Sequence, residues 1–82
     1  MKNLINLAVN QFTFSDEQGN KFFKSYNTVI AKRTVEGIVT LDPKHDYSKT
    51  TARYRNEFLG ETTKEVLNKI KKGDYKIENL NK

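Results

Sequence analysis

The sequence has no cysteine, one proline and four glycines among its 82 residues. Without cysteine the chain can form no disulfide, no thiolate metal site and no cysteine nucleophile. The glycines stand singly at positions 19, 37, 60 and 73, so they form neither a phosphate-binding loop nor a dinucleotide-binding fingerprint. Catalysis that depends on a nucleotide therefore has no support in the sequence.

Long apolar runs are also missing. No stretch approaches the ~18–20 apolar residues that span a bilayer. The first residues lack the apolar core and small-residue cleavage site of a secretory signal. We therefore expect a cytoplasmic protein with no membrane partner. The length suits one domain, so residues 1–82 are expected to form a single small α+β domain.

Positive charge is in excess. The chain has 15 Lys and Arg against 10 Asp and Glu, a formal net charge of +5. Such an excess favours a polyanion or an acidic protein surface as partner. The alternative is that the charge only keeps the protein soluble. Lys21, Lys24, Lys32 and Arg33 carry part of it on expected strands, and the strand register decides whether they form one patch.

Alternating apolar residues predict strands in the first half of the chain. The first is expected over residues 4–14, although its alternation changes phase near Asn10, which we interpret as a bulge or sharp twist. The polar, glycine-containing run SDEQGN predicts a hairpin loop. A second strand is expected over residues 21–34, and a short third one over residues 38–41, before Pro43.

After Pro43 the period becomes helical. The first helix is expected to begin at the N-cap Ser48 and to end at Gly60. The second begins with the capping-box pair Thr62 and Glu65 and ends at Gly73. The tail is expected to add a brief strand or to cover the core. The sequence thus predicts a three-stranded antiparallel β-meander followed by two α-helices packed on one sheet face.

The stretch YSKTTARYRNEFLG, residues 47–60, contains the candidate site. Helical spacing places its aromatic side chains against the sheet, and its cationic side chains on the opposite face or at its flank. Hydroxyls cluster at the helix start, where free N–H groups favour an anion. We predict that the partner or a phosphate is bound by Ser48, Lys49, Thr50, Arg53 and Arg55, supported by Tyr47, Thr51 and Tyr54.

Interpretations of this stretch that involve no binding role also remain. The cationic face can be merely solvated, and Ser48 can do no more than cap its own helix. His45, between Asp42 and Asp46, has the partners for a metal site or for acid–base chemistry, but a residue of a polar surface loop is the favoured interpretation. No catalytic residue, metal or cofactor is therefore predicted.

A resemblance to a known group of proteins covers residues 25–60. The matching runs are SYNTVIAKR, GIVTLD and DYSKTTARYRNEFLG. They resemble short uncharacterised proteins from phages and plasmids of Gram-positive bacteria, and the Tyr-Ser-x-Thr-Thr motif at 47–51 is the most specific part. Many members carry a His where this chain has Tyr54, so a role for that ring does not transfer. The resemblance implies an accessory gene of a mobile element, expressed inside the bacterial host cell.

These observations favour a binding function over an enzymatic one. We expect a small phage accessory protein that binds and modulates a host or defence complex through a basic face. That complex can itself handle nucleic acid, as a CRISPR effector does. The alternative is a regulator or replication accessory protein that binds DNA or RNA directly. A hydrolase built on His45 is a third interpretation, but no nucleophile-elbow motif supports it.

Overall fold

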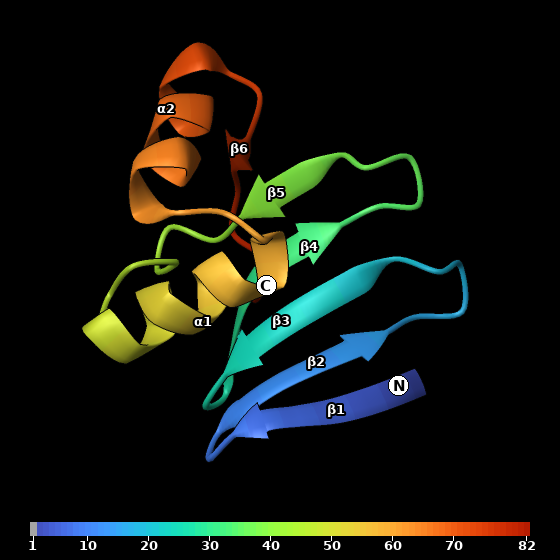
Figure 1. Cartoon of the computed structure of the whole chain (residues 1–82). Helices are drawn as coiled ribbons and strands as arrows, with labels where there is room; N and C mark the ends of the chain where they lie inside the picture. Colours follow the sequence, from blue (N-terminus) through green and yellow to red (C-terminus); the bar gives the residue numbers. More distant parts are fainter. Residues whose placement is uncertain (1) are drawn as a thin grey trace.

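The structure of the protein is a computed structural model that describes residues 2–82, with side chains from Leu4 onward. Its strands form one six-stranded sheet in the order of the sequence (Figure 1). Strands β1 to β5 are antiparallel, and β6 pairs with β5 in parallel. The elements are β1 (Lys2–Ala8), β2 (Gln11–Ser15), β3 (Lys21–Ser25), β4 (Thr28–Arg33), β5 (Val39–Leu41), α1 (Lys49–Leu59), α2 (Thr63–Lys72) and β6 (Lys76–Ile77).

The α+β class and the two helices are confirmed, but the prediction of three strands is wrong. The expected first strand is a hairpin, because the chain reverses at Val9 and Asn10, and Ala8 pairs with Gln11. Asn10 adopts a positive φ of 62°, a conformation that asparagine tolerates better than most residues. The change of phase that suggested a bulge therefore marks a two-residue turn.

The expected second strand divides in the same way. The chain turns at Tyr26 and Asn27, so that Ser25 pairs with Thr28. Tyr26 has a positive φ of 56°, and its N–H donates to the carbonyl oxygen of Asn10 in the neighbouring turn, with an N–O distance of 2.7 Å. A bulky residue rarely adopts this conformation, which is why the sequence does not signal the turn.

The helix boundaries follow their predicted caps. The Ser48 side chain accepts a hydrogen bond from the backbone N–H of Thr51, and Thr62 and Glu65 form the expected capping box. Gly60 and Gly73 both close their helices in the left-handed conformation. The tail adds the expected brief strand, and the Asn81 side chain then bonds both the N–H and the carbonyl of Val29.

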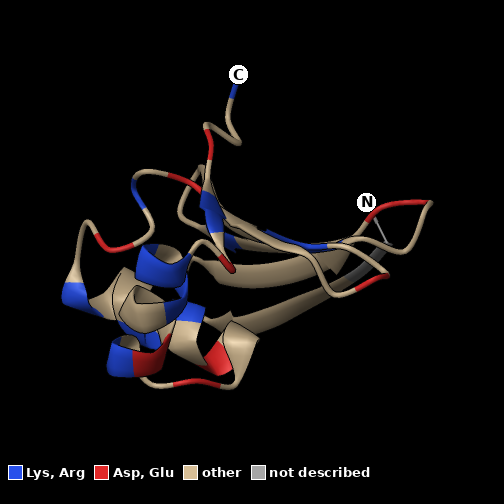
Figure 2. Ribbon diagram, turned by 90° about the horizontal axis from the view of Figure 1, so that it is seen from above, with Lys and Arg blue, Asp and Glu red and all other residues tan. Residues whose placement is uncertain are grey.

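The two helices lie on the same side of the sheet, as predicted (Figure 2). α1 contacts β2 and β3. The buried apolar residues of the core are Phe23, Ile30, Ala31, Val39, Leu41, Leu59 and Val66, with Tyr54, Phe58, Ile70 and Tyr75 packed against them. No helix in the described part of the chain is long and apolar enough to cross a membrane. The side of the sheet that faces away from the helices has no helical layer.

Candidate functional site

The hydroxyl cluster at the start of α1 is occupied within the protein. The Ser48 hydroxyl donates to Thr51 Oγ1 and accepts from the Thr51 N–H, at 3.0 and 3.1 Å. Thr51 is buried and shares a further hydrogen bond of 3.0 Å with Ser25 on β3. Thr51 therefore holds the helix start against the sheet, as predicted. Ser48 is committed to capping, which leaves Thr50 as the exposed hydroxyl of the three.

The predicted outward position of Arg55 is wrong. Its side chain is fully buried, and its guanidinium bonds His45, Asn56 and Thr63. The two bonds to Asn56 Oδ1 measure 3.1 and 2.8 Å. A buried charge is costly unless its donors are satisfied, and these contacts supply that satisfaction. Arg55 joins α1 to the loop before it and to the start of α2, so it is a structural residue.

His45 is also buried, contrary to the expectation of a surface loop residue. Its Nδ1 lies 2.7 Å from Arg55 Nη1. A guanidinium can only donate, so Nδ1 accepts and the neutral ring carries its proton on Nε2. Burial lowers the pKa of His45 below its ordinary value of 6.5, and the Arg55 charge also lowers it, while Asp46 and Asp42 act against them. The ring nitrogen needed for general-base chemistry is therefore engaged by Arg55.

Three predicted site residues do face solvent together. Lys49, Thr50 and Arg53 are exposed on α1, and we call them the α1 surface. Neither cation takes part in the ion pairs of the described residues, which join Lys69 to Glu61 and Lys72 to Asp74. The Arg53 guanidinium stacks over the Tyr54 ring at 5.4 Å, a contact that positions the group and leaves its N–H edges free.

An open hollow of about 540 Å³ adjoins the α1 surface. It is lined by Lys49, Ala52, Arg53, Asn56, Glu61, Thr62 and Thr63, so it lies between α1 and the start of α2. Both cations thus stand at the edge of a depression large enough for a protruding side chain of a partner. A carboxylate placed there would meet two charges that have no other ion-pair partner among the described residues.

The aromatic residues of the stretch divide differently from the prediction. Tyr54 and Phe58 pack against the core, as expected, and Phe58 stacks on Phe23 at 6.1 Å. Tyr47 is 52 % exposed, so its predicted role in holding the helix is wrong. It precedes the N-cap residue, where the chain is not yet helical, and the helical spacing used for the prediction does not apply to it.

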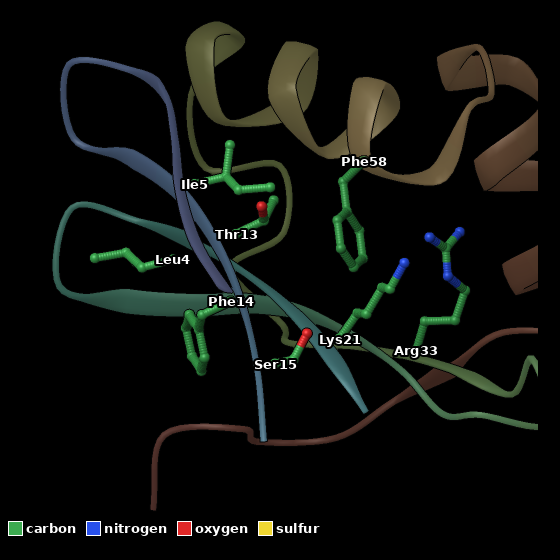
Figure 3. A pocket seen from close by; sticks show the side chains of 8 residues that line it. All are labelled: Leu4, Ile5, Thr13, Phe14, Ser15, Lys21, Arg33 and Phe58. Atoms are coloured by element: carbon green, nitrogen blue, oxygen red, sulfur yellow. The ribbon is translucent and has the colours of Figure 1, made fainter. Parts of the chain in front are cut away.

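A second hollow, of about 490 Å³, lies at the β1 edge of the sheet and is lined by Leu4, Ile5, Thr13, Phe14, Ser15, Lys21, Arg33 and Phe58. Figure 3 shows Ile5, Phe58, Lys21 and Arg33 on the side of the helix, while Phe14 points away from it. The Arg33 guanidinium lies 5.1 Å from the centre of the Phe58 ring. Lys21 pairs with Arg33 across the strands, so these two cations share the helix side.

The strand cations therefore do not form one patch. Lys21 and Arg33 face the helices, whereas Lys24 and Lys32 alternate with the buried Phe23 and Ala31 and face the opposite side. We call that opposite side the open face. None of the ten acidic residues of the chain lies in a strand. The sequence contains this separation of the charges. It could not be predicted, because the two turns that determine the strand register were missed.

The chain belongs to the DUF8033 family, a family of unknown function, which it matches over residues 1–76. No curated protein and no solved structure matches it at a significant level. Within the part of the chain that the structure describes, no group of three or more His, Cys, Asp or Glu residues is placed to hold a metal ion.

Proposed function

We propose that this member of the DUF8033 family is a non-enzymatic binding protein that engages an acidic partner through the α1 surface, Lys49, Thr50 and Arg53. The observation that carries the proposal is the pair of exposed cations, Lys49 and Arg53, at the edge of one open hollow. Both lie on a helix that is anchored by buried contacts of Thr51 and Arg55, so the backbone that carries them is held in place. A rigid support of this kind suits a binding surface.

The partner we propose is a host or defence complex in the cytoplasm of a bacterial cell. The resemblance of residues 25–60 to phage and plasmid proteins supports this context, and the family alone does not supply it. A mobile element gains from a small protein that blocks such a complex by occupying a charged site. The complex itself can be one that handles nucleic acid, because its surfaces for accessory proteins need not be its nucleic-acid site.

A capture experiment from bacterial lysate tests the proposal. The protein and the double variant Lys49→Gln/Arg53→Gln are used as baits, each with and without nuclease treatment. A partner captured by the unmodified protein in both conditions, and bound about tenfold more weakly by the variant in a purified binding assay, is the expected result. The matched control is Lys64→Gln/Lys71→Gln, which removes two exposed charges from α2.

Equal binding by both double variants would contradict the role of the α1 surface. Capture that disappears with nuclease would favour the second candidate function, direct binding of DNA or RNA. One observation favours that candidate: the strands carry Lys and Arg but no acidic residue. Phosphate contacts made by such strands would give an affinity that falls steeply with salt.

A further inference from the structure

The open face carries aromatic rings and lysines in cross-strand rows. Phe14 on β2 lies opposite Phe22 on β3, and Phe22 lies opposite Lys32 on β4. The same row continues through Thr40 on β5 to Lys76 on β6. In a second row, Phe12 on β2 lies opposite Lys24 on β3. Residues paired in this way share one face of a sheet.

In the first row the rings contact each other, and one ring contacts a lysine. The Phe14 and Phe22 rings stack with their centroids 5.1 Å apart and their planes 11° from parallel. The Lys32 ammonium lies 5.9 Å from the centre of the Phe22 ring. All three phenylalanines of the two rows remain partly exposed. The helices lie on the other side of the sheet, so neither of them covers these rings (Figure 2).

We propose that the open face binds single-stranded nucleic acid, with bases stacked on Phe12 and Phe14 and phosphates held by Lys24 and Lys32. Flat rings beside cations match the chemistry of a flexible strand, which presents unpaired bases beside a regular series of negative charges. The strands lack acidic residues, so no carboxylate from a strand repels the phosphates. This inference goes beyond the proposed role of the α1 surface and deepens the second candidate function, because it assigns a nucleic-acid ligand to the opposite side of the molecule.

The chemistry of the face favours a single strand over other occupants. In a duplex the bases are stacked on one another, so the rings could not contact them and only the phosphates would be bound. A protein that buried these rings would also have to remove Lys24 and Lys32 from water, and an interface centre is normally poor in lysine. Stacking on Phe rings tolerates any base, so weak sequence preference is expected.

The test measures fluorescence anisotropy of labelled oligo-dT and oligo-U at low salt, with the same length of duplex DNA for comparison. We expect both single strands to bind more tightly than the duplex. Phe14→Leu, which keeps an apolar side chain against Phe22, is expected to weaken single-strand binding by about fivefold to a hundredfold. Its matched control is Tyr47→Leu, which removes an exposed ring from the loop before α1.

The lysines are tested through the salt dependence. Lys24→Gln/Lys32→Gln is expected to reduce the slope of log affinity against log salt by about 1.4, which corresponds to two phosphate contacts on a single strand. Lys64→Gln/Lys71→Gln is expected to leave the slope unchanged. Circular dichroism and thermal unfolding establish that each variant is folded.

Three outcomes would overturn the inference: no binding of either single strand at low salt, tighter binding of the duplex, or equal losses in the open-face variants and their controls. Failure here is distinguishable from failure of the proposed function. The capture experiment depends on Lys49 and Arg53, which are unchanged in every variant used with the oligonucleotides.

Discussion

The two faces of the sheet are built from similar residues but are used differently. Phe22 and Phe23 are neighbours in β3, yet Phe23 is fully buried under α1 and Phe22 is partly exposed on the open face. On the covered face, rings, aliphatic side chains and Thr51 join the sheet to the helices. On the open face, the Phe22 ring contacts Phe14 and Lys32. The aromatic residues on the face covered by the helices therefore stabilise the fold, whereas those on the open face remain available to a ligand.

The largest expected difference between the faces is in stability. Phe23→Ala should lower the free energy of unfolding by about 3–5 kcal/mol, because it leaves a cavity among Phe58 and the core residues. Phe22→Ala should cost only about 1–2 kcal/mol, because a partly exposed ring loses less contact and one stacked pair. Urea unfolding of both variants gives the comparison. Equal losses would show that the open face is as deeply packed as the covered one.

The next difference contrasts two arginines of α1. Arg55→Ala should cost about 2–4 kcal/mol, since it leaves His45 Nδ1 and Asn56 Oδ1 without their donor and opens a cavity. Arg53→Ala should change stability by no more than about 0.5 kcal/mol, because Arg53 is exposed. Thermal or urea unfolding measures both. A small cost for Arg55→Ala would contradict its structural role.

The smallest effect is a dependence on pH. Since burial holds the pKa of His45 below 6.5, the unfolded chain binds a proton at this residue more readily than the folded one. The stability that the neutral ring contributes is complete above pH 6.5 and is lost as the pH falls from there through the lower folded pKa. Unfolding curves between neutral and mildly acidic pH measure this loss.

His45→Gln should flatten the stability profile in that pH window, since glutamine does not titrate there. The carboxylate of Asp42 provides an internal check at lower pH. Burial opposes its ionisation, but hydrogen bonds from the Leu80 and Lys44 N–H groups and from the Asn81 amide hold its pKa below 3.8. Its contribution to stability is therefore lost only in more acidic solution. A profile that keeps its slope near pH 6 in His45→Gln would assign the effect to another group.

Local signals in the sequence predicted the helical half well. Caps such as Ser48 and Thr62 act within one turn of their helix, so their partners can be found by spacing alone. The strand half was predicted less well, because the two missed turns depend on positive φ at Asn10 and Tyr26. Neither turn contains glycine, the residue that usually indicates such a reversal.

The candidate site was predicted only in part, because some of its residues depend on contacts with distant parts of the sequence. Spacing on a helix placed Lys49 and Arg53 outward correctly, since exposed cations are the ordinary case. It could not identify Arg55 as buried, because that depends on His45, ten residues earlier, and on Thr63 in the next helix. The open face depends on strand register, which the positions of the turns determine.

The Asp42 carboxylate connects its own loop to the C-terminal tail, two segments that are distant in the sequence. It accepts hydrogen bonds from Lys44 in its own loop and from Leu80 and Asn81 in the tail. The same loop continues to His45, and the tail reaches Val29. Residues 79–82 lie beyond the part that matches the family. Their hydrogen bonds hold the loop that contacts Arg55 through His45. Shortening the chain there would loosen the support beneath α1 although no residue of that helix had changed.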